Sequence, residues 1–433
     1  MERLKGKRLL VMDRTALAAC AVKRAKELGI YTIVANFYKT EDSPSKQIAD
    51  EAILIDISDI DAMLALIQEK KIDGIFVGWT DSHLPFYAEI CRRANLPCCG
   101  TLEQFDILSN DKRRFKECCE KYGVPVPKSY RLSMEFKKED LENIQYPVIV
   151  KPADESGSRG IRKCLNEEEL IENYTWLYNR SVSKKIFVEQ YIESNQEIFI
   201  HYTMKDGQYS LSSAFMKHRA QNENGVAASA ILHVFPITCL DTYRKNVEPS
   251  ILKLMKGLDL KYGAINFQGS VVGDQFYFYE SGLRMGGEQH YVFGDVLNGV
   301  NTLDLMIEFS LTGKMESADL LALDNPDYSK PCVNYYVTLR PGTISRIEGI
   351  EEVEKMPQVL QNATFKTIGM KIDPSNSLDR VIYRIHVMDD DVEKLAKTLE
   401  TISATLHIFD EYGEEMQLEV LTYDRALWML TNS

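Results

Sequence analysis

The chain has 433 residues, of which 45% are hydrophobic and 27% are charged, so its composition excludes disorder as the main state. With 51 Lys and Arg against 64 Asp and Glu, the formal net charge is −13, and no local basic patch offsets it, so we expect no nucleic-acid partner. No apolar run approaches the roughly 20 residues that span a bilayer, and the first ten residues lack a signal-peptide pattern, so no membrane association is expected.

The first hundred residues alternate strand and helix signals. Apolar runs predict strands at 8–12, 31–36, 52–56 and 73–78, and apolar residues at helical spacing predict helices at 15–28, 60–70 and 83–94. This order is typical of a parallel sheet with helices on both faces, which predicts an α/β, doubly wound, Rossmann-like domain over residues 1–109. The first strand–helix turn, Met12 to Ala16, carries no GxGxxG dinucleotide fingerprint.

Two further regions follow. A helix with an Asn or Asp cap is expected at 110–122, and Gly123-Val-Pro-Val-Pro ends it. Strands are expected at 146–151, 186–190, 197–204, 264–272 and 275–280, the last two joined by a turn at Gly273-Asp274. After residue 330, strands at 333–339, 381–387 and 418–421 and a helix at 391–399 predict a small, separate α+β domain over 330–433.

Three polar clusters in the middle region have the residue types that bind a phosphate and its metal ion. In the first, Lys151 ends a strand and precedes a loop that contains Ser156, Gly157 and Arg159. Lysine is a point charge for phosphate, glycine lets backbone N–H groups approach oxygens, and arginine adds a fork of donors. An ordinary hairpin loop explains this segment equally well.

The second cluster is an apolar strand that runs into Glu189, Gln190, Tyr191 and Ile192. Extended backbone beside apolar side chains suits the edge of an adenine ring. Glu197 follows eight residues after Glu189 and could accept hydrogen bonds from ribose hydroxyls. A solvated strand end is the simpler alternative for each of these residues taken alone.

The third cluster lies on two strands that the turn at Gly273-Asp274 would pair. Gln268 lies on the first strand and Glu280 ends the second, and Arg284, Gly286 and Gly287 follow. A carboxylate, an amide oxygen and an arginine that converge are what a magnesium-bound phosphate needs. An edge hairpin with a solvated rim is the alternative.

Together, and in this order, the clusters resemble the ATP-grasp superfamily, in particular the L-amino-acid ligases and the carbamoyl phosphate synthetase large subunit. The resemblance covers about residues 1–325. It implies an ATP-grasp domain over 110–329, with a mobile lid subdomain at about 125–192, and ATP with Mg²⁺ or Mn²⁺ as cofactors. By the same resemblance Lys112, Lys151 and the Gly-rich loop would contact ATP phosphates, Glu189 to Ile192 would lie at the adenine, Glu197 at the ribose, and Gln268 and Glu280 at the metal.

One position departs from the resemblance. The family pattern Glu-x-Asn-x-Arg reads Glu280-Ser-Gly282-Leu-Arg284 here, so Gly282 stands where the family has an Asn that binds the metal. Glycine has no side-chain oxygen, and the second metal would be held loosely or completed by water. Mg²⁺ commonly keeps several waters beside one or two carboxylates, so the departure does not remove the predicted site.

Substrate residues are expected in two segments. Lys217, His218 and Arg219 could bind a carboxylate or its acyl phosphate, although a solvated turn is an equally good interpretation. Gly286, Gly287 and His290 could line the same cavity, while the histidines at 201, 233, 386 and 407 show no ligand spacing and receive no role. The run Gly342 to Ile350 resembles the final domain of L-amino-acid ligases.

The resemblance implies an ATP-dependent carboxylate–amine ligase that acts through an acyl phosphate on an amino acid or small carboxylate, with Arg284 as the catalytic residue. Two alternatives stay open: a bicarbonate-activating enzyme similar to carbamoyl phosphate synthetase or biotin carboxylase, and a non-catalytic ATP-binding regulatory protein. The expected partners are ATP, a carboxylate and an amine, and a homodimer is a candidate assembly. Nine cysteines without a CxxC motif favour reduced thiols and a cytoplasmic location.

Overall fold

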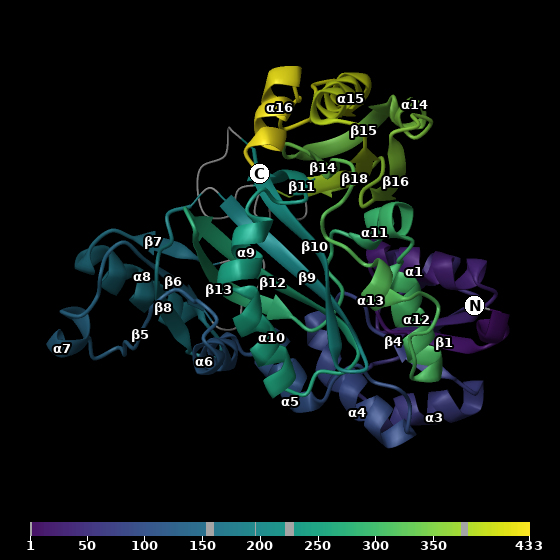
Figure 1. The fold of residues 1–433 in the computed structure, drawn as a ribbon, viewed down its shortest axis with the longest axis horizontal. Coiled ribbons are helices and arrows are strands. Elements are labelled where there is room, and N and C mark those ends of the chain that lie inside the picture. The colour runs from purple at the N-terminus through teal and green to yellow at the C-terminus, as the bar shows by residue number, and fades with distance from the viewer. Residues whose placement is uncertain (1, 153–159, 195, 221–228, 374–379) are drawn as a thin grey trace.

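The computed structural model describes residues 2–152, 160–194, 196–220, 229–373 and 380–433. These residues form four sheets with helices packed around them (Figure 1). Ser156, Gly157 and Arg159, three residues predicted to bind ATP, lie outside the described residues. Among the helices of these ranges, none is both long and apolar enough to cross a bilayer.

The N-terminal region is the predicted parallel sheet, with strand order β3-β2-β1-β4. Its central strands are buried on both faces, which is why they read as continuous apolar runs. The strands are β1 (Arg8–Val11), β2 (Tyr31–Asn36), β3 (Glu51–Leu54) and β4 (Gly74–Phe76). The helices are α1 (Ala16–Glu27), α2 (Pro44–Ile48), α3 (Ile60–Lys70) and α4 (Leu84–Ala94), with short 3-10 turns at η1 (Glu2–Leu4), η2 (Thr40–Asp42) and η3 (Asp81–His83).

A second, antiparallel sheet forms the region predicted as a lid. Its order is β5-β8-β6-β7, and α8 covers one face with its own apolar core around Val148, Leu170 and Leu177. The elements leading into it are α5 (Leu102–Phe105), the π-helical turn η4 (Asp106–Asn110) and α6 (Lys112–Tyr122). The lid elements are β5 (Ser129–Tyr130), α7 (Lys138–Leu141), β6 (Val148–Pro152), β7 (Arg162–Cys164), α8 (Glu167–Arg180) and β8 (Ile186–Gln190).

The largest sheet has eight strands in the order β13-β12-β9-β10-β11-β14-β18-β16, and its pairs are antiparallel. The strands are β9 (Gln196–Lys205), β10 (Gln208–Arg219), β11 (Ala230–Phe235), β12 (Gly263–Val272), β13 (Gln275–Gly282), β14 (Cys332–Thr338), β16 (Val359–Thr364) and β18 (Val381–Met388). The helices beside it are α9 (Leu240–Asn246), α10 (Glu248–Gly257), α11 (Tyr291–Asn298), α12 (Thr302–Thr312) and α13 (Leu320–Leu323). Since β11 pairs with β14, residues on both sides of position 330 share one sheet.

The C-terminal region adds a three-stranded sheet, order β17-β15-β19, and two long helices. Its elements are β15 (Gly342–Glu348), α14 (Ile350–Val353), β17 (Lys371–Ile372), α15 (Val392–Thr405), β19 (His407–Asp410) and α16 (Tyr423–Thr431). The strand predicted at 418–421 is wrong: the chain makes an isolated bridge from Gln417 to Leu339 and then runs without a strand into α16. The apolar residues Leu418 and Leu421 are buried there against the core instead.

Candidate active site

The predicted metal pair lies on neighbouring strands. Gln268 on β12 is directly opposite Glu280 on β13, because the hairpin turns at Gly273, which has a left-handed φ of 58°. Gln268 is half-buried and its amide nitrogen donates to Glu197, whereas Glu280 is exposed. The amide oxygen of Gln268 and the carboxylate of Glu280 are thus carried by adjacent backbone positions.

The two predicted phosphate lysines come from the lid side. Lys112 is the first residue of α6, whose cap Asp111 accepts hydrogen bonds from the backbone N–H groups of Arg113 and Arg114. Helix α6 packs against β13. Burial lowers the pKa of Lys112, and the nearby charge of Glu280 partly opposes this shift. The Lys112 ammonium is therefore close enough to the Glu280 carboxylate to feel its charge.

Lys151 is the penultimate residue of β6 and forms an ion pair with Glu189 of β8, with 2.7 Å between Nζ and Oε2. A third cation, Lys116 of α6, binds the other oxygen of Glu189 at 2.9 Å and also donates to Pro127 O and Ser129 Oγ. Burial raises the pKa of Glu189, but Lys151 and Lys116 outweigh this effect and hold the pKa below its usual value. The Glu189 carboxylate therefore holds two lysines, and it is only 2% exposed.

Glu197 of β9 is the centre of a second buried ion cluster. Lys217 lies 3.2 Å and Arg219 2.7 Å from Glu197 Oε2, and Gln268 donates to Oε1. Burial raises the pKa of Glu197, yet Lys217 and Arg219 outweigh it and lower the pKa to about 2. Two of the predicted substrate residues thus contact the predicted ribose residue.

The third predicted residue of that run, His218, lies on the other face of β10. Its Nε2 lies 2.7 Å from Ser433 Oγ, and its ring packs edge-on against Trp428 of α16. Alternate residues of a strand point to opposite faces, which separates His218 from Lys217 and Arg219. The structure therefore does not bring these three residues together.

Arg284 follows β13 and is held by a residue that the sequence did not single out. Its Nε and NH2 atoms donate to the two carboxylate oxygens of Asp81 at 2.9 and 2.8 Å, and NH1 donates to Met285 O. Asp81 belongs to η3 in the N-terminal region. This bidentate pair fixes the plane of the guanidinium between two parts of the chain.

The segment after Arg284 is held through its backbone carbonyl groups. Trp79 Nε1 donates to Gly286 O at 3.1 Å, Arg384 donates to Gly287 O, and Asn334 Nδ2 donates to Glu288 O at 2.6 Å. His290 is buried and its Nδ1 lies 3.0 Å from Glu288 Oε1. Gly286, Gly287 and His290, three predicted substrate residues, are thus part of one anchored loop.

The remaining predicted nucleotide residues are on or just after β8. Gln190, Tyr191 and Ile192 are half-buried, and Lys163 lies over the Tyr191 ring with Nζ 4.1 Å from the ring centre. A cavity of about 860 Å³ lies between α6, β5 and β8. Of the predicted site residues only Lys112 lines it within the described ranges, so the cavity lies beside the polar clusters rather than among them.

Sequence reasoning missed Lys116, Asp81 and His201. Lys116 lies four residues after Lys112 on one helix face, a spacing that could have suggested it. Asp81 and His201 carried no local signal, because each meets its partner only through the tertiary fold. His201 Nε2 lies 2.9 Å from Glu288 Oε1, which comes from a distant part of the chain.

Comparisons with known proteins identify the ATP-binding region of the chain and its fold. Residues 111–291 match the family model described as carbamoyl-phosphate synthase L chain, ATP binding domain. The solved L-amino acid ligase from Bacillus licheniformis superposes with a TM-score of 0.77 at 19% identity, over 94% of this chain and 99% of that chain. Residues 111–291 thus form an ATP-binding domain of this family, and the chain has the ATP-grasp fold.

Two curated proteins show how the ATP-grasp chain compares with longer relatives. The 2-oxoglutarate carboxylase small subunit of Hydrogenobacter thermophilus is 32% identical over 210 residues, 44% of each chain. The carbamoyl phosphate synthase large chain of Clostridium beijerinckii is 23% identical over 418 residues, 92% of this chain and 38% of that protein. The ATP-grasp chain thus spans less than half the length of each.

Proposed function

We propose that this ATP-grasp protein is an ATP-dependent carboxylate–amine ligase that forms an acyl phosphate and releases ADP and phosphate. The observation that carries the proposal is the pairing of Gln268 with Glu280 on β12 and β13 beside the Lys112 ammonium. Oxygen ligands next to cations are the arrangement that phosphoryl transfer requires. The likeness to an L-amino acid ligase over nearly the whole chain supports this choice of reaction.

The donor set fits magnesium. The nitrogen of the Gln268 amide is engaged by Glu197, so its oxygen is the atom left to face a cation, and Glu280 is exposed beside it. Mg²⁺ binds through one or two protein oxygens together with water and substrate phosphates, so these two side chains suffice. Bound magnesium would neutralise charge on the phosphates of ATP.

The other predicted site residues would bind the phosphates or stabilise charge during the reaction. Lys112 and Lys151 would bind phosphate oxygens, and Glu189, assisted by Lys116, holds Lys151 at the end of β6. Arg284 would neutralise charge on the transferred phosphoryl group and on the tetrahedral intermediate. Its fork with Asp81 keeps the guanidinium oriented before substrate arrives, which avoids reorganisation during the reaction.

The substrate residues follow from the loop and from β10. Gly286 and Gly287 would form the wall nearest Arg284, and His290, which is buried and bonded to Glu288, would support this wall from the protein interior. Lys217 and Arg219 would contribute through Glu197, whose carboxylate they already neutralise. An acyl phosphate attacked by an amine then yields an amide, with the protein excluding water from the mixed anhydride.

A screen for phosphate release across amino acids, other small carboxylates and amines tests the reaction. We expect release only when both a carboxylate and an amine are present. Bicarbonate activation is the second candidate, because the Hydrogenobacter relative is a 2-oxoglutarate carboxylase subunit. Release that requires bicarbonate alone would select it, and ATP binding without any release would contradict both enzymatic proposals.

The metal assignment is tested by Glu280→Ala. The variant should fold, because Glu280 is exposed, and should lose magnesium-dependent ADP formation by a factor of about 100 or more. Asp274→Ala, at the exposed tip of the same hairpin, is the matched control and should keep wild-type turnover. Normal turnover of Glu280→Ala at saturating magnesium would remove this residue from the metal site.

A further inference from the structure

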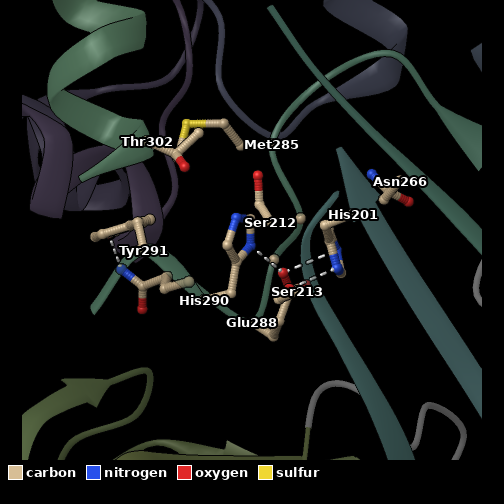
Figure 2. Close-up of polar contacts among 12 residues, drawn as sticks. His201, Ser212, Ser213, Asn266, Met285, Glu288, His290, Tyr291 and Thr302 are labelled. Atoms are coloured by element: carbon tan, nitrogen blue, oxygen red, sulfur yellow. Dashed lines mark hydrogen bonds and ion pairs between the residues drawn. The ribbon is translucent and has the colours of Figure 1, made fainter. Parts of the chain in front are cut away.

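Two histidines and a glutamate, His201, Glu288 and His290, form a buried cluster (Figure 2). His201 comes from β9, and Glu288 and His290 come from the segment between β13 and α11. One ligand atom from each residue lies within 4.8 Å of the other two. All three residues are at most 5% exposed, so the cluster is shielded from solvent.

The hydrogen bonds in the cluster leave ring nitrogens without partners. His290 Nδ1 bonds to Glu288 Oε1 at 3.0 Å. His201 Nε2 lies 2.9 Å from the same oxygen and has no other partner among the described residues, and His290 Nε2 has no hydrogen-bond partner among them. Two buried histidine nitrogens, His201 Nε2 and His290 Nδ1, thus share the single oxygen Glu288 Oε1, and one ion bound between these three atoms would satisfy all of them.

The orientation of His201 is fixed from the far side of its ring. Its Nδ1 lies 3.2 Å from Ser213 Oγ on the adjacent strand β10. A hydrogen bond at one ring nitrogen sets the direction of the other, which is how proteins orient histidines that bind metals. Nε2 of His201 is thereby aimed at Glu288.

The cluster packs directly against the backbone of Gly286, where no side chain fits. A Cβ atom built on Gly286 would lie 2.2 and 2.3 Å from the two Glu288 oxygens and 2.3 Å from His201 Nε2. The carboxylate and the ring nitrogen therefore converge on one region beside bare backbone. Any residue larger than glycine at 286 would fill the region that the ligand atoms share.

We propose that His201, Glu288 and His290 bind a divalent transition-metal ion, with Zn²⁺ the best match. Two nitrogens and one carboxylate suit zinc, whereas magnesium prefers oxygen ligands alone. Ligand atoms of tetrahedral zinc lie roughly 3.4 Å apart, as follows from bonds of about 2.1 Å, so the two contacts to Glu288 Oε1 must open by a few tenths of an ångström. The ion would tie β9 to the loop that follows Arg284, at a place distinct from Gln268 and Glu280.

Equilibrium dialysis of the full chain against micromolar ZnCl₂, without nucleotide, followed by elemental analysis, tests this site. Wild type should retain one equivalent of zinc, and CoCl₂ in its place should give the visible ligand-field bands of a four-coordinate ion. His201→Asn and Glu288→Gln should each weaken binding more than about 100-fold, and Ser213→Ala about tenfold, because it only orients His201. Gly286→Ala should also abolish binding.

His407→Asn is the control, since His407 forms an exposed pair with Glu415 at 3.0 Å and represents adventitious histidine–carboxylate sites. Its zinc content should equal that of wild type. Zinc-dependent elevation of the wild-type melting temperature provides a readout that needs no variant to fold. Wild type without bound zinc, or equal binding by His201→Asn, would overturn the proposal whatever the outcome for ATP turnover.

Discussion

The Glu189 carboxylate is almost completely buried, which disfavours its charged form, and two lysines keep it ionised. Lys116 and Lys151 approach from a helix and a strand, and all three side chains are nearly inaccessible to water. A buried ion pair contributes little net stability over an apolar replacement, but removing one partner leaves the other charge uncompensated. Glu189 and Lys116 therefore fix the position of the Lys151 ammonium.

Glu189→Gln should consequently destabilise the protein by about 3 kcal/mol, because two buried ammonium groups lose their counter-ion. Urea unfolding measures the effect. Glu193→Gln is the matched control, since Glu193 is exposed and its pair with Lys163 is long, at 3.6 Å, so a change below about 0.5 kcal/mol is expected. Similar stability of the two variants would contradict the role given to Glu189.

Gly282 shows how the structure changes an expectation drawn from sequence. Its backbone does not have a left-handed φ, so conformational freedom is not what requires glycine. A Cβ atom there would lie 3.1 Å from Asn266 Nδ2 and 3.2 Å from Arg284 Cζ. A side chain at 282 would therefore press on the Asn266 amide, which donates to Gly282 O and Arg284 O, and on the Arg284 guanidinium.

We therefore expect Gly282→Asn to lower turnover several-fold at every magnesium concentration, since the new side chain must displace Asn266 or the guanidinium of Arg284. The measurement is a magnesium titration of ADP release, with melting as the check on folding. A lower magnesium requirement at full turnover would instead mean that Asn266 yields and that the added amide oxygen reaches the metal.

At the scale of the element, successive side chains of strand β10 point to opposite faces of the sheet and therefore meet different partners. Lys217 and Arg219 point toward Glu197, and His218 points toward α16. Burial, together with the charge of Arg425, lowers the pKa of His218 to about 4. The folded protein thus disfavours the protonated ring.

The lowered pKa of His218 makes the stability of the folded protein depend on pH. Below about pH 6.5 the unfolded chain takes up a proton on His218 that the folded chain does not, so stability decreases as pH falls toward 4. Between pH 7 and 5 this residue alone should account for about 2 kcal/mol of lost stability. His218→Asn should remove that part of the slope in urea unfolding at several pH values, and identical slopes would contradict the assignment.

Local signals sufficed for elements whose pattern matches their environment. The helix 60–70 and the strands 31–36 and 186–190 were predicted with the bounds that the structure has. The strand expected at 418–421 failed because buried apolar residues occur in loops that cross a core as well as in strands. The convergence of Arg284 with Asp81, or of His201 with Glu288, depends on how distant segments pack, and no spacing in the chain encodes it.

At the scale of the whole molecule, the N-terminal region reaches the site through Asp81, which binds Arg284, and through Trp79, which donates to Gly286 O. Other links lie farther away: Arg24 forks onto Asp304 at 2.7 Å for both contacts, and Arg3 pairs with Glu308. These anchor the parallel sheet to helix α12. The N-terminal region thus positions a catalytic candidate without containing the nucleotide residues.

Asp81→Asn should lower kcat of the proposed ligase by about 10- to 100-fold with little change in melting temperature, because a misplaced guanidinium loses its orientation. Asp61→Asn, which breaks the exposed 2.8 Å pair with Arg93, is the control and should leave kcat unchanged. Steady-state ADP release provides the comparison. An unaffected kcat in Asp81→Asn would mean that the fork serves only to join the two regions.

The eight-stranded sheet is continuous across position 330, so the regions before and after it share hydrogen-bonded strands. Strand β11 is paired along its length with β14, from Leu232 opposite Tyr335 to Phe235 opposite Cys332. Cutting the chain near residue 330 would strip β11 of that neighbour and expose a row of unpaired N–H and C=O groups next to buried apolar side chains. Such an edge recruits strands from other molecules and leads to aggregation. The C-terminal region is therefore a protective cover for the sheet that carries Glu197 and Gln268, and the nucleotide-binding half is not expected to persist as a separate soluble fragment.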